Sequence, residues 1–224
     1  MKQGCIPSAD AAFVAAMEDV LDLYEQPYNA KEPVVCFDES SKQLIQEIRS
    51  STPLAPGCVA KQDYEYQRNG VCNLFLFFEP LASWRHIQPT LHRTSQDFAH
   101  CMRWLVDVAH PDADCIHVIL DNLNIHAAAS LYETFEPQEA RRILKHLCFH
   151  HTPKHGSWLN MAEIEFSVVS RLVLQERIPD MAHLGRLIWL YDAERNRKQA
   201  TVNWQFTTAD ARIKLRRLYP SISD

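Results

Sequence analysis

The sequence lacks any apolar run close to the roughly 20 residues that a membrane-spanning helix needs. Its N-terminus, "MKQGCIPSADAAF", has no apolar segment behind a basic start, as a secretory signal would have. Repeats and low-complexity tracts are also missing. A chain of 224 residues that is 46% hydrophobic can bury a core as one domain, or as one domain with an appendage. We therefore expect an intracellular, cytoplasmic protein.

Closely spaced cysteine pairs are absent too. The seven cysteines are odd in number, lie far apart and include no C-x-x-C pair: Cys5, Cys36, Cys58, Cys72, Cys101, Cys115 and Cys148. This argues against a disulfide framework or a cysteine zinc site and favours reduced thiols in apolar positions. The histidines His150, His151 and His155 give only a weak zinc signal, because adjacent residues on an extended segment face apart and no zinc-like spacing to a further ligand is evident.

An overall positive charge is the third feature that is missing, since the net charge is −5. The charges are unevenly placed, however. Residues 1–60 hold four Lys/Arg against nine Asp/Glu, whereas residues 171–219 hold ten against five. This asymmetry permits a basic surface for a polyanion near the C-terminus, and a solvated helix face explains it equally well.

The pattern of apolar residues predicts a helix over 8–26 with Ser8 as its cap, followed by a buried strand over 34–40 that ends at Asp38. The Asn69-Gly70 pair favours a tight turn, so "YEYQ" and "VCNLFLFFE" are expected to pair as a hairpin.

A helix over 95–109 behind a Ser95 cap and a second apolar strand over 115–122, with Asp121 at its end, come next. A short helix near "AAASLYETF" and the apolar piece "HLCFHH" follow. This order predicts an α/β fold in which helices pack on both faces of a mixed sheet. In such folds the chemistry gathers at the ends of strands, where both aspartates fall.

Asp38 and Asp121 could converge with a glutamate from a later helix. An aspartate that closes a strand is common and by itself favours a turn residue. Three carboxylates at one sheet edge, however, repel each other unless cations lie among them. Oxygen ligands suit Mg²⁺ or Mn²⁺, and two such ions are suited to phosphodiester cleavage.

Two glutamates of "TPKHGSWLNMAEIEF" compete for the third position. Glu163 lies three residues after Asn160 and could complete a capping box there. Glu165 points to the middle of the apolar arc of the expected helix, which is unusual for a carboxylate. The pattern alone leaves the choice open. Glu39 is a further alternate, but it adjoins Asp38 and should face the opposite side of its strand.

Three segments, "VVCFDES", "HVILDNLNIH" and "HHTPKHGSWLNMAEIEF", resemble in that order the catalytic segments of DDE-superfamily transposases, specifically the bacterial insertion-sequence group related to Tc1/mariner. The similarity runs from about Lys2 to Pro220. It implies a ribonuclease H-like fold. It also implies an endonuclease that uses divalent metal ions for phosphoryl transfer in DNA transposition, a form of DNA recombination.

Carried over to this sequence, the resemblance implies that Asp38 and Asp121 are metal ligands and catalytic residues. The family's third carboxylate ends a Leu-Asn-Pro-Ile-Glu segment, which aligns with residues 159–163 and implies Glu163, with Met161 in place of the usual Pro. Two ions, Mg²⁺ or Mn²⁺, are then expected. The implied partners are DNA, both transposon ends and target, and a second copy in a homodimer on DNA. The implied location is the bacterial cytoplasm, associated with the nucleoid when on DNA.

The domain expectation is an N-terminal helical arm or linker (1–32), a ribonuclease H-like DDE catalytic core (33–178) and a C-terminal helical extension of the same domain (179–224). Family members carry one or two helix-turn-helix modules before the catalytic domain, whereas a single short helix precedes the first strand here. The sequence therefore suggests a truncated or split product. The negative net charge of the chain fits the loss of those modules, which are usually basic.

Further polar residues could line the site or contact DNA. Exposed loops, stabilised turns and a solvated helix face explain the same residues without any function. These candidates are Asn122, His126, Lys154, His155, Asn160 and, on an expected C-terminal helix that opens with a capping box from Thr207 to Asp210, Arg212, Lys214, Arg216 and Arg217.

Two alternatives to a transposase have the same fold. One is a structure-selective nuclease, which would hydrolyse DNA without joining strands. The other is a catalytically silent remnant of a transposase that acts in binding or dimerisation. Carboxylate-dependent binding of Mn²⁺ would separate the enzymes from the remnant.

Overall fold

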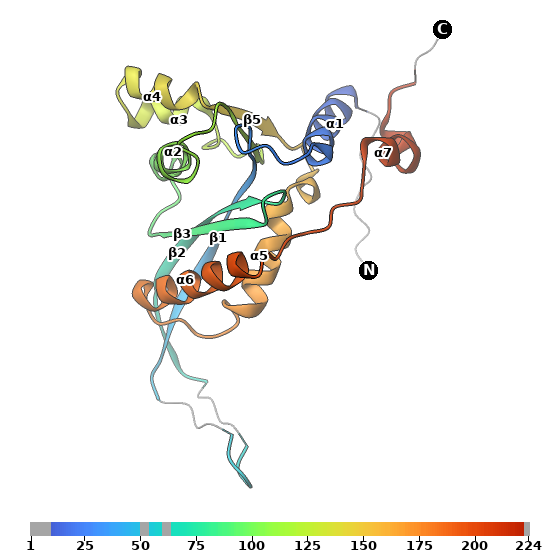
Figure 1. The fold of residues 1–224 in the computed structure, drawn as a ribbon. Helices are drawn as coiled ribbons and strands as arrows, with labels where there is room; N and C mark the ends of the chain where they lie inside the picture. The colour runs from blue at the N-terminus through green and yellow to red at the C-terminus, as the bar shows by residue number, and fades with distance from the viewer. Residues whose placement is uncertain (1–9, 50–53, 60–63, 222–224) are drawn as a thin grey trace.

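The strands form one five-stranded mixed sheet in the computed structural model, which describes residues 10–49, 54–59 and 64–221 (Figure 1). The order is β3-β2-β1-β4-β5, with β1, β2 and β3 antiparallel and β4 and β5 parallel to β1. The strands are β1 (Val34–Glu47), β2 (Tyr66–Glu79), β3 (Trp84–Thr90), β4 (Ile116–Leu120) and β5 (Leu147–His151). The expected α/β class with a mixed sheet is therefore confirmed.

Helices cover both faces of the sheet. The helical segments are α1 (Ala11–Glu25), α2 (Ser95–Trp104) with the π-helical turn η1 (Leu105–Ala109), α3 (Ala128–Thr134), α4 (Pro137–Leu144), the 3-10 turn η2 (Ser157–Leu159), α5 (Met161–Leu172), α6 (Met181–Arg197), α7 (Thr208–Lys214) and the 3-10 turn η3 (Arg216–Leu218). One core lies between the sheet and α1, α5 and α6, and the other lies between the sheet and α2, α3 and α4 (Figure 1). None of the helices described is both long and apolar enough to cross a bilayer.

Alternation along β1 assigns each residue to one of these cores. Val34 and Cys36 join the α1/α5 core, whereas Val35 and Phe37 join the α2–α4 core. Because successive side chains of a strand point to opposite faces, Asp38 continues on the α1/α5 side. Both faces are covered there, which explains why the first four residues of the strand, Val34 to Phe37, are all apolar. The prediction that the strand ends at Asp38 is wrong, because β1 continues to Glu47 in its antiparallel pairing with β2.

The same alternation holds on β4, where Val118 and Leu120 face the α2–α4 core and Ile119 faces the other one. Cys36 pairs with Ile119 across the parallel ladder. Asp38 and Asp121 each lie two residues beyond this pair. The register of two parallel strands therefore brings the two aspartates to the same face and the same level of the sheet.

The expected helix starts need correction at their caps. Ser8 lies outside the described residues, and α1 begins at Ala11 because the side chain of Asp10 accepts a hydrogen bond from the backbone N–H of Ala12 (2.9 Å). The second helix is capped by Thr94 rather than by Ser95, in a reciprocal capping box with Asp97. A cap needs extended backbone and an acceptor at the right reach, which neighbouring residues can also supply.

The predicted hairpin at Asn69-Gly70 is wrong, because both residues lie inside the continuous strand β2. Gln43 pairs with Val71 and Ile45 pairs with Arg68, so two residues of β2 oppose one residue of β1. The pair therefore forms a β-bulge, in which Gly70 takes a φ of 90°. The tolerance of positive φ is used as expected, but for a bulge instead of a turn.

The expectation that all the cysteines are reduced is wrong for one pair, since Cys115 and Cys148 form a disulfide. They are 33 residues apart in sequence, and the pairing of β4 with β5 brings them together. A search for closely spaced cysteines cannot detect such a pair. Cys36, Cys72 and Cys101 are buried free thiols, as predicted.

Candidate active site

The start of α5 is fixed beside Asp38 by the side chain of Asn160, which is 2% exposed. Its Oδ1 accepts a hydrogen bond from the N–H of Ala162 (3.1 Å) and caps the helix. Its Nδ2 donates to the carbonyl oxygen of Phe37 (2.8 Å), the residue before Asp38. One amide group therefore joins the helix that carries Glu163 to the strand that carries Asp38.

The loop that leads into α5 is held from both sides. Gly156 donates its N–H to the carbonyl oxygen of Pro153 (2.8 Å), and a Cβ at Gly156 would lie 2.5 Å from Cγ of Pro153. Only glycine fits this close approach. On the other side, the hydroxyl of Tyr24 on α1 donates to the carbonyl oxygen of Leu159 (2.7 Å). The loop therefore delivers the helix start to a defined place.

Asp38 occupies a site that disfavours its charge. Burial raises the pKa of its carboxyl group to about 7, against a hydrogen bond from the N–H of Glu39 that lowers it. The negative charges of Glu39, Asp121 and Glu163 raise the pKa further. The carboxylates of Asp121 and Glu163, from distant parts of the chain, and that of the neighbouring Glu39 thus lie near enough to Asp38 to repel it electrostatically.

His126 lies between two of these acids and is 1% exposed. Its Nδ1 is 2.7 Å from Oδ1 of Asp121, and its Nε2 is 2.9 Å from Oε2 of Glu39. Burial lowers the pKa of His126, but the contacts with Asp121 and Glu39 outweigh it and raise the pKa to about 9. The imidazolium in turn lowers the pKa of Asp121. His126 therefore keeps Asp121 ionised while Asp38 tends to hold a proton.

Glu39 faces away from Asp38, as the alternation of the strand predicts. Its carboxylate contacts His126 and, at 3.4 Å, Nη1 of Arg93. It therefore supports His126 from the α2–α4 side of the sheet.

Glu163 and Glu165 differ sharply in their surroundings. Glu163 is exposed on the first turn of α5, and the capping box considered for it is not formed, because the N–H of Asn160 donates to Ser157 instead (2.8 Å). Glu165 is fully buried. Its carboxylate accepts from the hydroxyl of Tyr191 (2.6 Å) and pairs with Nε of Arg85 (2.9 Å) and Nη2 of Arg195 (3.0 Å).

The carboxylate that the helical periodicity marked as unusual is therefore engaged in a buried ion pair that joins α5 to β3 and α6. Its oxygens are occupied by protein donors. The oxygens of Glu163, in contrast, face the solvent side of the site, where a ligand can reach them.

The other loop candidates lie around the ends of β4 and β5. Asn122 donates through Nδ2 to the carbonyl oxygen of Thr152 and so ties the loops after these strands together. Asn122 and Lys154 line a cavity that α1 closes on the other side. Lys154 and His155 are exposed, and His155 has a φ of 65° at the tip of the turn.

Of the four C-terminal basic residues, two are paired with acidic side chains and two are exposed without such a pairing among the described residues. The capping box between Thr207 and Asp210 is confirmed. Arg212 forms two contacts with Glu18 of α1 (2.9 and 2.8 Å), and Lys214 contacts Asp210 (2.8 Å). The helix α7 ends at Lys214, so the expectation that it also carries the next two arginines is wrong.

Arg216 and Arg217 belong to η3, after a change of backbone direction at Leu215, where the φ is −111° and the ψ is 21°. Both arginine side chains are exposed.

A ribonuclease H-like sheet with one aspartate inside β1 and another directly after the neighbouring strand β4 defines the class of fold, and comparison with known families agrees with it. The family described as DDE superfamily endonuclease matches residues 33–184. The chain therefore belongs to this family, and the resemblance inferred from the three segments is confirmed.

Solved structures of the Mos1 mariner transposase resemble the fold. One is a paired-end complex with Mn (TM-score 0.55, 13% identity, covering 89% of this chain and 62% of that chain). Another is a strand transfer complex (TM-score 0.56, 12% identity, covering 89% and 61%). The chain thus spans about three fifths of the length of these relatives. The comparison with curated proteins finds no match.

The contrast between the two glutamates predicts a large effect on stability for one and almost none for the other. Glu165→Ala should lower the free energy of unfolding by about 3–5 kcal/mol, because Arg85 would be left buried without its partner. Glu163→Ala should change it by no more than about 0.5 kcal/mol, as is usual for an exposed side chain. Urea unfolding followed by circular dichroism measures both. Equal losses in the two variants would contradict this assignment of the buried ion pair.

The raised pKa of Asp38 predicts how stability depends on pH. In the folded chain without divalent ions the carboxyl group keeps its proton up to about pH 7, whereas the ordinary value is 3.8. The folded state therefore loses stability from this group as the pH rises between these values. Asp38→Asn removes the titration and keeps the acceptor for Glu39.

We expect Asp38→Asn to be more stable than the wild type above about pH 7 in the presence of a chelator, and to lose that advantage towards about pH 4. Urea unfolding across this pH range is the measurement. Parallel pH profiles of the two proteins would show that Asp38 titrates normally.

Proposed function

We propose that this chain is the catalytic domain of a transposase, which cuts DNA phosphodiester bonds and joins a 3′ hydroxyl to target DNA with Asp38, Asp121 and Glu163 as its catalytic, metal-binding residues. The observation that carries the proposal is that the β1–β4 register brings Asp38 and Asp121 to the same face of the sheet, while Asn160 ties the start of α5, which carries Glu163, to the residue before Asp38. Membership of the DDE endonuclease family supports it. So does the fold shared with Mos1, whose structures include complexes with Mn and with Mg.

The residues suit hard divalent cations. The three side chains are oxygen ligands, as Mg²⁺ and Mn²⁺ prefer, and a nearby cation would relieve the repulsion that raises the pKa of Asp38. Two ions bound here would supply Lewis-acid activation of the attacking oxygen and stabilisation of the leaving oxygen. Asp38, Asp121 and Glu163 would hold them.

The surrounding residues would preserve this arrangement. His126 keeps Asp121 ionised and fixes the orientation of its carboxylate through Nδ1. Glu39 contacts the other ring nitrogen, Nε2, and so fixes the orientation of His126. Asn160 keeps the first turn of α5, and with it Glu163, next to β1. These are positioning residues, whereas Glu165 is structural.

DNA contact would involve the basic and polar groups that remain accessible. Lys154 and His155 lie on the loop before α5, and Arg216 and Arg217 are exposed in η3. Arg212 and Lys214 are already paired with Glu18 and Asp210, so we propose a smaller part for them.

Residues 33–178 would form the catalytic core, with 1–32 and 179–224 as additions to the same domain. The six apolar side chains that α1 buries support a close attachment of the first addition. The paired-end complexes of Mos1 suggest a homodimer on DNA as the working form.

A comparison of Glu163→Gln with Glu165→Gln tests the third ligand. We expect Glu163→Gln to abolish cleavage of plasmid DNA with Mg²⁺ or Mn²⁺ and to remain folded. Glu165→Gln should retain cleavage at a temperature where circular dichroism shows it folded. Asp38→Asn serves as the inactive reference. Loss of cleavage in folded Glu165→Gln, with activity kept in Glu163→Gln, would overturn the assignment.

The DNA assay and a metal titration separate the two alternatives. Cleavage without any joining of strands would point to a nuclease. The absence of Mn²⁺ binding that depends on the carboxylates, in isothermal titration calorimetry, would point to a silent remnant.

Metal binding should depend on pH through Asp38. Below its pKa of about 7 a proton competes with the cation, so the Mn²⁺ affinity should fall about tenfold per pH unit. Above about pH 7 the affinity should level off. Calorimetric titrations at about pH 6 and about pH 8 compare the two regimes. Equal affinities would rule out Asp38 as the proton-linked ligand.

A further inference from the structure

A Cys-x-His sequence occurs twice in the chain, as Cys115-Ile116-His117 and as Cys148-Phe149-His150. The first copy runs into β4 and the second lies on β5, and these strands are parallel neighbours. Ile116 and Phe149 face the α2–α4 core. Because alternate residues share a face, both cysteines and both histidines lie on the opposite side, towards α1.

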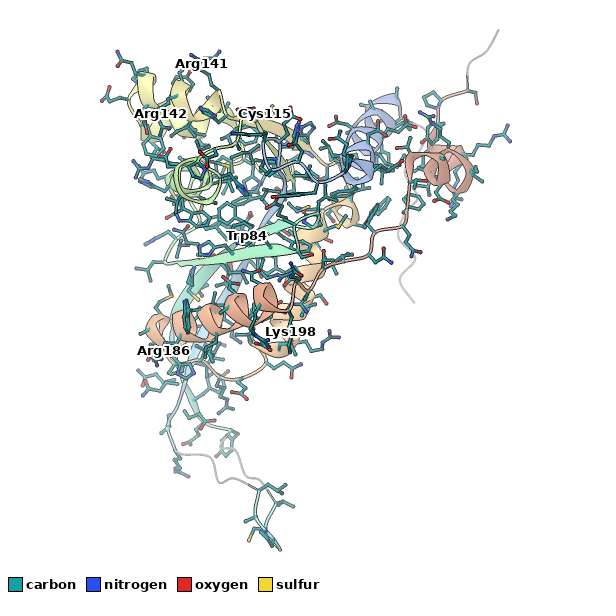
Figure 2. All side chains as sticks on the ribbon, viewed as in Figure 1. Trp84, Cys115, Arg141, Arg142, Arg186 and Lys198 are labelled. Atoms are coloured by element: carbon teal, nitrogen blue, oxygen red, sulfur yellow. A yellow bond between two sulfur atoms is a disulfide. The ribbon has the colours of Figure 1, made fainter. Side chains whose placement is uncertain are left out.

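Three of the four side chains converge there, and the fourth lies beside them. Ligand atoms of Cys115, His117 and Cys148 all lie within 4.8 Å of one another. Nδ1 of His117 is 2.9 Å from Nε2 of His150, which brings the fourth side chain into the same cluster. His117 pairs with Cys148 in the register of the ladder, so the proximity follows from the sheet itself. Cys115 is labelled in Figure 2, in the region where Figure 1 labels β5 and α1.

The carboxylate of Asp19 fixes the orientation of the His150 ring. Nδ1 of His150 is 2.7 Å from Oδ2 of Asp19 on α1, which leaves Nε2 pointing into the cluster. A histidine that binds a metal through one nitrogen commonly donates its other N–H to a carboxylate, because this fixes the tautomer and the ring orientation. Asp19 fills this position.

We propose that Cys115, His117, Cys148 and His150 form a tetrahedral Zn²⁺ site when the two cysteines are reduced, with Asp19 as the group that orients His150. Two thiolates and two imidazoles are a usual ligand set for structural zinc. Zinc–sulfur bonds of about 2.3 Å and zinc–nitrogen bonds of about 2.0 Å put such ligand atoms about 3.3–3.8 Å apart. This falls within the 4.8 Å that encloses the ligand atoms of Cys115, His117 and Cys148.

Zinc and the disulfide are alternative states of the same two sulfur atoms. A small-molecule dithiol can reduce the Cys115–Cys148 disulfide: it gives up two electrons and two protons, closes to its own cyclic disulfide and leaves two protein thiols. Zn²⁺ then binds the two thiolates, and their two protons are released to solvent. A small-molecule disulfide that takes up two electrons from the thiolates and two protons from solvent, and is released as two thiols, would re-form the protein disulfide and expel the ion. The site therefore links the packing of α1 against β4 and β5 to the redox state of the two cysteines.

This zinc site is separate from the proposed catalytic centre. Its thiolate and imidazole ligands select zinc, whereas the carboxylates of Asp38, Asp121 and Glu163 suit Mg²⁺ or Mn²⁺. The two sites share β4, on which His117 lies four residues before Asp121. Zinc binding would therefore stabilise the strand that positions a catalytic residue, and either proposal can fail without the other.

Cobalt is the probe that tests the site most specifically. The full-length chain, reduced and freed of metal, should bind one equivalent of Co²⁺ with a thiolate-to-cobalt charge-transfer band and the intense visible bands of tetrahedral cobalt. Zn²⁺ should displace the cobalt and remove the bands. Carboxylate-bound cobalt gives no thiolate band, so the catalytic centre does not interfere. Absence of the band at one equivalent would overturn the proposal.

Variants locate the ligands. Cys115→Ser should weaken the charge-transfer band, because only the thiolate of Cys148 is left, while Cys58→Ser, which changes an exposed free cysteine, should keep its full intensity. Asp19→Asn should keep the band but weaken Zn²⁺ binding by roughly 10–100-fold, as measured by competition with a chromogenic chelator. An unchanged band in Cys115→Ser would assign the cobalt to other thiols and contradict the site.

A measurement on the wild type covers the case in which Cys115→Ser fails to fold. Zn²⁺ should protect Cys115 and Cys148 of the reduced protein from alkylation, and peptide mass mapping should find exposed Cys58 modified throughout. Equal alkylation of Cys115 and Cys148 with and without Zn²⁺ would show that the pair forms a disulfide without a metal site.

Discussion

Carboxylates that meet in a partly dehydrated place repel one another, and this repulsion governs the surroundings of Asp38. Burial and the charges of Glu39, Asp121 and Glu163 hold the pKa of Asp38 at about 7. A fold optimised only for stability would separate these groups or give each a partner. The chain instead gives a buried cation, His126, to Asp121 and Glu39, and leaves Asp38 and Glu163 without one among the described residues. The uncompensated charge marks the place where cations would bind.

The rigid parts of the molecule explain how this unfavourable arrangement persists. The parallel ladder between β1 and β4 sets Asp38 and Asp121 side by side, and the amide of Asn160 ties α5 to β1. Deeper along α5, Glu165 joins Arg85 and Arg195 in a buried ion pair. Two glutamates separated by one residue thus have different tasks: Glu165 fixes the helix, and Glu163 extends from the helix that Glu165 has fixed.

The strands and helices that carry the acidic residues could be predicted from the sequence, because their local sequence patterns agree with the structure. Apolar runs that stop at Asp38 and Asp121 identify the two strands, although only Asp121 follows the end of its strand, because β1 continues to Glu47. The helical periodicity correctly placed Glu165 in the core, although its partners could not be known, since Arg85 and Arg195 come from β3 and α6. The hairpin turn expected at Gly70 is wrong, because a residue with positive φ serves bulges as well as hairpin turns.

The contacts that the sequence could not reveal depend on strand register. His126 reaches Glu39 across the sheet edge, and Cys115 meets Cys148 only because β4 and β5 are neighbours. Spacing along the chain says nothing about either pair. The repeated Cys-x-His pattern was the one available signal for the second cluster, and it acquires meaning only once the strands are known to be parallel.

Anomalous scattering from a crystal soaked in Mn²⁺ would test the central claim most directly, because it locates the ions without relying on activity. The account predicts manganese peaks bounded by the carboxylates of Asp38, Asp121 and Glu163, with Glu165 still paired to Arg85 and Arg195. An ordered, fully soaked crystal with no manganese between these three carboxylates, or with manganese bound to Glu165, would contradict it.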